Sequence, residues 1–225
     1  GAELEGGRLN VAWVFEDHAA VYEKPGGTRL KSEVRPQWER LEVLDTVVKK
    51  GRRWFRIGDG RWVEEGDVRS PTAAPMPGEA APGERWIDVD IGNQVVTAYE
   101  GERPVFATLV STGKGKGKSI LATPVGTHRI WVKLLSSDMD NLENEEASRY
   151  YAIQDVPWVM FFEKGYGLHG TFWHRSFGRV RSHGCVNLTP LDAQRLFNWT
   201  GPTLPAGWTA ALPTPYDRGT LIRVR

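Results

Sequence analysis

Ser182-His183-Gly184-Cys185-Val186-Asn187 is the stretch that decides the fold and the chemistry of this chain, because it holds the only cysteine among 225 residues. A second histidine stands upstream, in Leu168-His169-Gly170-Thr171. A free thiol has a pKa of about 8.5, so it becomes a strong nucleophile at neutral pH only when a base accepts its proton. Glycine beside it lets a substrate carbonyl approach backbone N–H groups that can hold an oxyanion. The pattern predicts that Cys185 is a nucleophile and that either His169 or His183 is its base.

The sequence after this stretch predicts one helix, and the sequence before it predicts strands. Thr189 is a natural N-cap, Pro190 suits the first helical position, and Gly201-Pro202 ends the helix. In residues 86–91 apolar and acidic residues alternate, as they do in a half-buried strand. Residues 85–225 are therefore expected to form a mainly β domain, a sandwich or a set of mixed sheets with one or few helices.

A stretch rich in proline and alanine, residues 71–84, separates two regions of the chain. Such a composition is typical of a semi-extended linker. Before it, short apolar runs are joined by turn signals such as Pro25-Gly26-Gly27 and the hairpin dipeptide Asp59-Gly60. This pattern predicts a small β-barrel domain over residues 1–70, a linker over 71–84 and a second domain over 85–225.

The totals exclude some classes of protein. Lys and Arg number 29 against 28 Asp and Glu, and this balance argues against a nucleic-acid-binding protein, which would carry a basic excess. A single cysteine cannot form an internal disulfide. No run of about 18 apolar residues is present, so no membrane span is expected in this chain. The first residues do not have the pattern of an export signal, which is either absent or already removed.

Residues 168–193, LHGTFWHRSFGRVRSHGCVNLTPLDA, resemble the signature of the L,D-transpeptidases, the YkuD-type cysteine enzymes of bacterial cell walls. The family pattern is His-Gly, a spacer, then Ser or Thr before His-Gly-Cys, a hydrophobic residue and Arg or Asn. Residues 122–130, ATPVGTHRI, also match the Thr-Pro-x-Gly strand of the family. This resemblance covers residues 85–225. Residues 8–69 resemble bacterial SH3 domains, which implies an SH3-like binding module at the N-terminus.

The family resemblance implies a role for each residue of the catalytic motif. Cys185 would be the acylated nucleophile, and His169 would be the base that pairs with it. The backbone carbonyl of Gly170 would orient the ring of His169. His183, Gly184 and the Cys185 amide would support the oxyanion site.

Five further residues are candidates for substrate binding. Ser182 would orient the catalytic motif without touching the substrate. Asn187 would either form a hydrogen bond to the donor stem peptide or brace the turn that carries Cys185. Tyr151 and Trp158 lie in the part of the sequence that walls the substrate groove in the family. Arg181 belongs to a basic stretch near the nucleophile, which would attract stem-peptide carboxylates.

The resemblance implies that Cys185 attacks the bond between the third residue of a tetrapeptide stem, an L-centre, and the terminal D-Ala. The acyl group then passes to an acceptor. The resemblance leaves three acceptors open. Another stem would give a 3–3 cross-link, and a cell-wall or outer-membrane protein would become attached to the peptidoglycan. Water would make the protein an L,D-carboxypeptidase. A non-catalytic peptidoglycan-binding protein is the alternative from a different class.

The remaining expectations concern partners and surroundings. Peptidoglycan stem peptides are the expected partners, the periplasm or the cell wall is the expected location, and carbapenem β-lactams are the implied acylating inhibitors. His183-x-Cys185 lacks the spacing of a structural zinc site, so no metal and no other cofactor is predicted. The acidic residues 138–149 are a candidate cover for the substrate groove.

Overall fold

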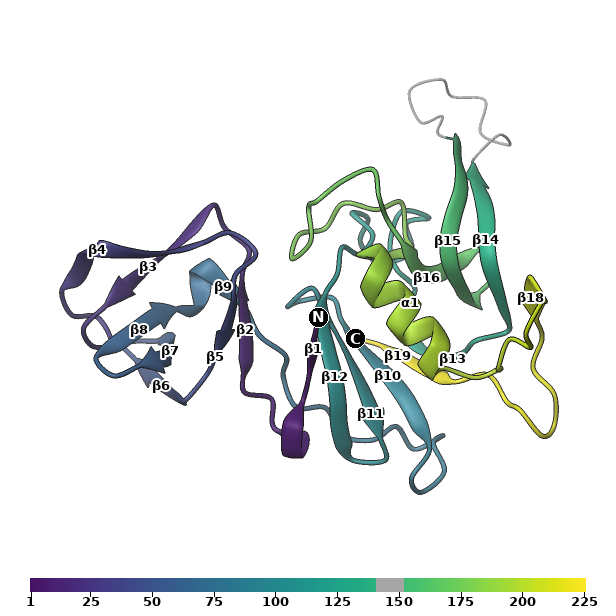
Figure 1. Cartoon of the computed structure of the whole chain (residues 1–225), viewed down its shortest axis with the longest axis horizontal. Helices are drawn as coiled ribbons and strands as arrows, with labels where there is room; N and C mark the ends of the chain where they lie inside the picture. Colours follow the sequence, from purple (N-terminus) through teal and green to yellow (C-terminus); the bar gives the residue numbers. More distant parts are fainter. Residues whose placement is uncertain (141–151) are drawn as a thin grey trace.

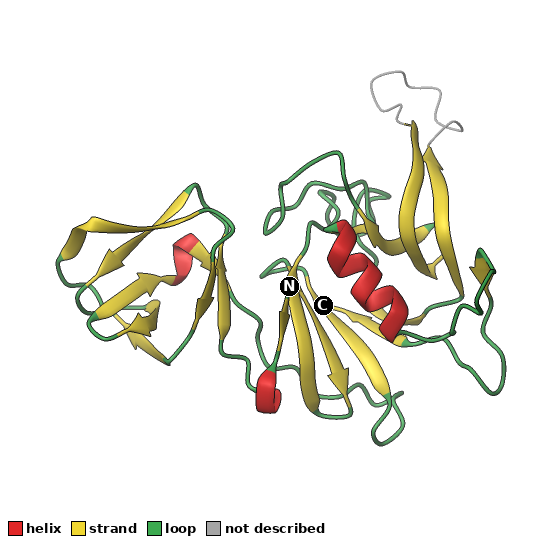
Figure 2. Ribbon diagram, viewed as in Figure 1, coloured by secondary structure: helices red, strands yellow, loops and turns green. Residues whose placement is uncertain are grey.

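The computed structural model describes residues 1–140 and 152–225, which form two β-rich units side by side (Figure 1). The N-terminal unit contains strands β2 to β9, and the C-terminal unit contains β1, β10 to β19 and the helix α1 (Pro190–Trp199). Figure 2 shows this helix lying across the strands of the C-terminal unit. The expectation of a mainly β protein with one helix is confirmed for the residues that the structure describes.

Two sheets build the C-terminal unit. The first has the order β1 (Ala2–Glu3), β12 (Arg103–Leu109), β11 (Val95–Glu100), β10 (Arg85–Asp90), β19 (Leu221–Val224) and β13 (Gly126–Arg129). The second has the order β17 (Val186–Leu188), β16 (Tyr166–Gly170), β15 (Ala152–Glu163), β14 (Val132–Asp140) and β18 (Ala210–Ala211). In each sheet one parallel pair, β10 with β19 and β16 with β17, interrupts an otherwise antiparallel order.

One apolar core joins the two sheets and the helix. It includes Ile87, Val96, Met160, Phe162, Leu168, Val186, Leu188, Leu196 and Phe197. The helix begins where the sequence predicts, because the Thr189 hydroxyl accepts a hydrogen bond from the Asp192 N–H at 3.2 Å. At the other end the buried Lys133 donates from Nζ to the carbonyls of Phe197 and Thr200, at 2.5 and 2.8 Å. A cation at these carbonyls stabilises the helix end.

Two separate sheets build the N-terminal unit around a second apolar core that includes Val14, Val21, Leu41, Phe55 and Val63. One has the order β5 (Arg40–Glu42), β2 (Val11–Val14) and β9 (Val68–Arg69). The other has the order β4 (Arg29–Pro36), β3 (His18–Tyr22), β8 (Arg61–Glu64), β7 (Arg52–Gly58) and β6 (Asp45–Lys49). No closed barrel is found among these described strands, so the SH3-like barrel of the prediction is not confirmed. The expected Asp59-Gly60 hairpin does join β7 to β8.

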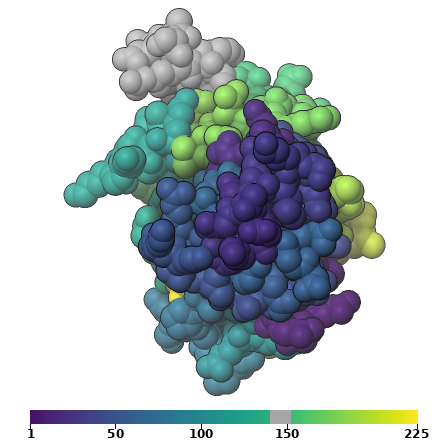
Figure 3. All heavy atoms as spheres, turned by 90° about the vertical axis from the view of Figure 1, so that its left-hand side faces the viewer, coloured from purple at the N-terminus to yellow at the C-terminus, as the bar shows by residue number. Residues whose placement is uncertain are grey.

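The chain before β2 does not remain with the N-terminal unit. Ala2 and Glu3 pair with Ala107 and Phe106 at the edge of the first C-terminal sheet. A short 3₁₀ helix (Glu5–Gly7) then leads into the N-terminal unit. In Figure 3, a view from the left-hand side of Figure 1, the N-terminal unit stands in front of the C-terminal unit.

The proline-rich stretch after β9 is docked on the first C-terminal sheet. Ala74 and Met76 pack against the buried pair Trp86 and Tyr99, whose rings stack at 4.3 Å. The hydroxyl of Tyr99 accepts a hydrogen bond from the Ala74 N–H at 3.3 Å. Side chains of the C-terminal unit therefore fix the path of this stretch, which ends in hydrogen-bonded turns at Pro77–Ala80 and Ala81–Glu84.

Candidate active site

The parallel pair β16 and β17 brings the two motif segments together. Leu168 pairs with Val186, and His169 pairs with Asn187. Leu168 and Val186 belong to the apolar core. Because side chains alternate along a strand, His169 and Asn187 face the opposite side of the sheet, away from that core. Cys185 lies in the bend just before β17, so the same register holds it close along the chain to the strand that pairs with His169.

His169 is held in one orientation. Its side chain is 2% exposed, and its Nδ1 lies 3.1 Å from the carbonyl oxygen of Gly170. The Thr171 hydroxyl is 3.5 Å from the same nitrogen, and the ring of Trp173 stacks on the imidazole at 5.8 Å. An Nδ1–H that donates to the Gly170 carbonyl leaves Nε2 as the basic nitrogen. This is the contact that the sequence resemblance implied for Gly170.

The environment keeps both reacting groups neutral at rest. Burial lowers the pKa of His169 to about 4, against a smaller opposing effect of its bond to the Gly170 carbonyl. Burial also raises the pKa of the Cys185 thiol to about 11, although a backbone hydrogen bond from Gly167 acts in the other direction. The thiol sulfur lies 3.7 Å from the carbonyl oxygen of Gly165. At neutral pH Cys185 is therefore a thiol and His169 an uncharged imidazole.

Alkylation of Cys185 by iodoacetamide is expected to be slow at pH 7 and to rise about tenfold per pH unit until pH approaches 11, because the thiolate fraction follows the raised pKa. The rate is measured by intact mass across this pH range. In guanidinium the same cysteine should titrate near its ordinary pKa of about 8.5. A rate that is already constant from pH 7 upward in the folded protein would indicate a preformed thiolate–imidazolium pair and contradict the prediction.

The turn before Cys185 is braced by Ser182. The Ser182 hydroxyl donates to the carbonyl of Cys185 at 2.5 Å and accepts from the N–H of Gly184 at 3.0 Å. The Gly184 carbonyl accepts from the Thr123 hydroxyl at 2.7 Å. The N–H of Gly184 is engaged within the turn, so any support that Gly184 gives the oxyanion site comes through the shape of the turn. Ser182 likewise supports the turn from within, and the Cys185 amide remains the candidate oxyanion donor.

Gly184 is required by its conformation and by its surroundings. Its φ is +125°, and a Cβ built there would lie 2.4 Å from Cε1 of Tyr166 and 3.3 Å from the carbonyl oxygen of Ala122. Such a conformation costs a residue with a side chain roughly 1–3 kcal/mol. We expect Gly184→Ala to lower the free energy of unfolding by at least about this amount, measured by urea titration.

A matched control for this substitution is Gly66→Ala, because no atom lies within 4 Å of a Cβ at Gly66 and its φ is not in the left-handed region. We expect the control to change the free energy of unfolding by less than about 0.5 kcal/mol. Equal stabilities of the Gly184→Ala and Gly66→Ala proteins would contradict the assignment.

Asn187 joins the motif to the loop that follows β16. Its side-chain amide lies 2.8 Å from Nε2 of His174, and Nδ1 of His174 accepts from the Ser176 N–H at 3.1 Å. Burial lowers the pKa of His174, and Arg181 adds to the effect. Of the two alternatives for Asn187, the structure shows the bracing contact. His174 is not among the residues that the sequence singled out, and it becomes a partner of the motif only through the fold.

The other candidates for substrate binding have different positions. Trp158 is half-buried, and its ring packs against Phe197 of the helix at 5.4 Å, so part of it contributes to the core; its place in the groove wall stays a prediction. Arg181 is exposed, and its N–H donates to the Thr112 carbonyl at 3.0 Å. Tyr151 lies outside the described residues, as does most of the proposed cover at 138–149.

His183 is exposed, and burial and then Lys114 lower its pKa. The backbone N–H of Lys114 donates to the Ser182 carbonyl at 3.1 Å. The start of the basic loop at residues 113–118 therefore lies against the turn that precedes Cys185. Lys114 opposes a positive charge on His183. His169 is the better candidate for the base because its ring is buried and is oriented by the Gly170 carbonyl.

Within residues 1–140 and 152–225, no three His, Cys, Asp or Glu side chains gather as a metal site would require. No helix in the same part of the chain is both long enough and apolar enough to cross a membrane.

The family model of the YkuD L,D-transpeptidase catalytic domain matches residues 84–222, which is more than half of the chain. The chain therefore belongs to the YkuD L,D-transpeptidase family. A search of curated proteins found no match.

Solved structures with a similar fold include three L,D-transpeptidases. A mutant form of the Enterococcus faecium enzyme is 21% identical with a TM-score of 0.48, and the match covers 64% of this chain and 50% of that one. The Mycobacterium smegmatis enzyme is 19% identical with a TM-score of 0.48 and 80% and 79% coverage. LdtMt1, solved in complex with imipenem, is 18% identical with a TM-score of 0.50 and 80% and 81% coverage. This chain thus spans about half the length of the Enterococcus protein.

Proposed function

We propose that this protein is a peptidoglycan L,D-transpeptidase with Cys185 as nucleophile and His169 as base. The observation that carries the proposal is the β16–β17 register, because it pairs the strand that holds His169 with the strand that begins directly after Cys185. The orientation of His169 by the Gly170 carbonyl supports it, because Nε2 is the nitrogen left to accept the thiol proton. The family of the chain supports the substrate class.

The proposed reaction has two acyl transfers. In the first, the Cys185 sulfur forms a bond to the carbonyl carbon of the L-centre while its proton moves to Nε2 of His169. The C–N bond to the terminal D-Ala then breaks, and the imidazolium gives its proton to the leaving amine. The Cys185 amide would hold the oxyanion of the tetrahedral intermediate.

In the second transfer, an acceptor amine attacks the thioester, His169 takes a proton from that amine, and the thiol is regenerated. The neutral resting pair suits this sequence of steps, because an uncharged imidazole is ready to accept a proton at pH 7. The raised pKa of the thiol also protects it from unproductive reactions until a carbonyl is bound.

The experiment that tests the activity offers the full chain a tetrapeptide stem ending in D-Ala, with a second stem carrying a free amine as acceptor. We expect release of D-Ala and a cross-linked product, both followed by mass spectrometry, and neither in the Cys185→Ala protein. Release of D-Ala with a tripeptide product alone would assign the carboxypeptidase alternative. Binding of stems without any D-Ala release would assign the non-catalytic alternative and contradict the proposal.

The location follows from the proposed substrate. Peptidoglycan lies outside the cytoplasmic membrane, so we infer that the protein acts in the periplasm or the cell wall. A cell-wall or outer-membrane protein as acceptor is a further proposal, which the same assay tests when such a protein replaces the second stem.

A further inference from the structure

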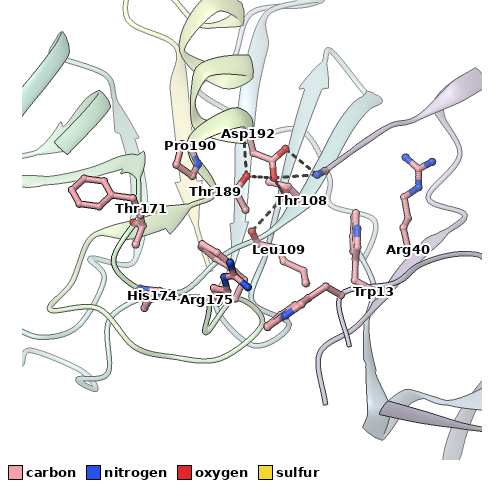
Figure 4. A pocket seen from close by; sticks show the side chains of 14 residues that line it. Trp13, Arg40, Thr108, Leu109, Thr171, His174, Arg175, Thr189, Pro190 and Asp192 are labelled. Carbon is pink, nitrogen blue, oxygen red and sulfur yellow. Dashed lines mark hydrogen bonds and ion pairs between the residues drawn. The ribbon is translucent and has the colours of Figure 1, made fainter. Parts of the chain in front are cut away.

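A cavity of about 580 Å³ lies between the N-terminal unit and the C-terminal unit. Figure 4 shows Trp13 and Arg40 entering it from the N-terminal unit, opposite His174 and Arg175 on the loop after β16. The start of the helix, with Thr189 and Asp192, forms another wall. Neither unit alone encloses this space, so the arrangement of the two units creates it.

The cavity presents cations without partners. Arg40 and Arg175 are exposed, and across the described ranges neither side chain has an ion pair or a hydrogen bond. The acid in the wall, Asp192, is occupied, because its carboxylate accepts from the hydroxyls of Thr108 and Thr189 at 2.6 and 2.8 Å. An unpaired guanidinium at a cavity binds a carboxylate through charge-assisted hydrogen bonds.

Aromatic rings accompany these cations. Trp38 and Phe172 line the cavity and are 36% and 60% exposed, while Trp13 and Phe177 are almost fully buried behind them. Exposed rings around a concave space typically pack on the apolar face of a sugar or peptide ligand. The lining therefore suits a carboxylate that is attached to such a scaffold.

The cavity also adjoins the candidate active site. Thr171 and His174 line it, the first 3.5 Å from Nδ1 of His169 and the second 2.8 Å from the Asn187 amide. A ligand in the cavity would thus lie next to Thr171 and His174, which contact His169 and Asn187. Cys185 itself does not line the cavity.

We propose that this cavity between the units is a second subsite, which binds a carboxylate carried on a peptide stem of the peptidoglycan strand. Arg40 and Arg175 supply the charge that recognises the carboxylate, and Trp38 and Phe172 pack on the stem or on the sugar attached to it. The subsite rests on the proposed function for its ligand. It also gives the N-terminal unit a direct part in holding the substrate.

Binding is measured by isothermal titration calorimetry with the full chain carrying Cys185→Ala, which removes turnover. The probe is a soluble disaccharide-tetrapeptide released from peptidoglycan. We expect Arg40→Ala and Arg175→Ala each to raise the Kd about tenfold, the loss typical of one charge-assisted hydrogen bond. Amidation of the probe's carboxylates should weaken binding to the parent chain by a similar factor.

The matched control is Arg53→Ala, an exposed arginine of the N-terminal unit that pairs with Glu65 on the surface. Its Kd should equal that of the parent. The same tetrapeptide without sugar distinguishes the two scaffolds: weaker binding assigns Trp38 and Phe172 to the sugar, and equal binding assigns them to the peptide. An unchanged Kd in both cavity variants, or equal binding of the amidated probe, overturns the subsite.

A second readout separates this proposal from the proposed function. Acylation of the single variants Arg40→Ala and Arg175→Ala, with Cys185 intact, by the small carbapenem meropenem should match the parent, because neither Cys185 nor His169 lines the cavity. If meropenem acylates Cys185 but the cavity variants bind the disaccharide-tetrapeptide as tightly as the parent does, the subsite proposal fails and the proposed activity stands. If meropenem does not acylate Cys185 in the parent protein, the proposed function itself fails.

Discussion

Replacing His169 with Gln is expected to lower the rate of Cys185 acylation by about 10²–10⁴, the usual contribution of a positioned general base. The thiol has a pKa of about 11, so without a base to accept its proton the reactive thiolate is scarce at pH 7. The rate is measured by stopped-flow or intact mass with meropenem. His18→Gln, an exposed histidine on β3, is the matched control and should leave the rate unchanged.

The pH dependence of acylation should change in the same variant. In the parent, the rate falls as the pH drops through about 4, because protonated His169 no longer accepts the thiol proton. This acid limb should be absent from the His169→Gln protein. A variant that acylates within about threefold of the parent and keeps the acid limb would show that another group is the base.

Replacing Asp88 with Ala is expected to lower the free energy of unfolding by about 2 kcal/mol, because it removes a buried carboxylate that accepts charge-assisted hydrogen bonds from two arginines, one half-buried and one exposed. Asp88 is 1% exposed, and its carboxylate accepts hydrogen bonds from both Arg223 and Arg225 at 2.7 to 3.1 Å. Arg223 and Arg225 also hold the proline-rich stretch through the carbonyl of Pro75 and the hydroxyl of Thr72. Loss of Asp88 therefore loosens this attachment as well.

Urea titration measures the effect of Asp88→Ala. Asp45→Ala is the control, since Asp45 forms an exposed ion pair with Arg56 at 4.0 Å, and such pairs contribute about 0–1 kcal/mol. A loss in Asp88→Ala no larger than that of the control would mean that Asp88 does not organise this edge of the sheet.

The parts of the fold that local sequence determines could be predicted. The helix start depends on Thr189 and Pro190, which are adjacent in the chain, and the structure places both as expected. The contact between His169 and the Gly170 carbonyl is also local and followed from the family motif. By contrast, Ala2 and Glu3 are too short a segment to carry a periodic pattern, so their pairing with β12 could not be read from the sequence.

The contacts that could not be predicted are of two kinds. Some join residues that are distant in the chain, and others involve a side chain for which the sequence offers several possible partners. The sequence resemblance gave Gly184 a part in the oxyanion site, but in the fold the N–H of Gly184 donates to the Ser182 hydroxyl. His174 reaches Asn187 only because the loop after β16 turns back over β17. An aromatic residue such as Trp158 occurs both in substrate grooves and in cores. Only the packing of β15 against the helix places its ring beside Phe197.

The most direct test of the central claim is the intact mass of the full chain after incubation with meropenem under reducing conditions, followed by peptide mapping. The account predicts one adduct per chain, mapped to Cys185, which forms rapidly in the parent, slowly in His169→Gln and not at all in Cys185→Ala. A parent protein that stays unmodified, or an adduct that maps to another residue, would contradict it.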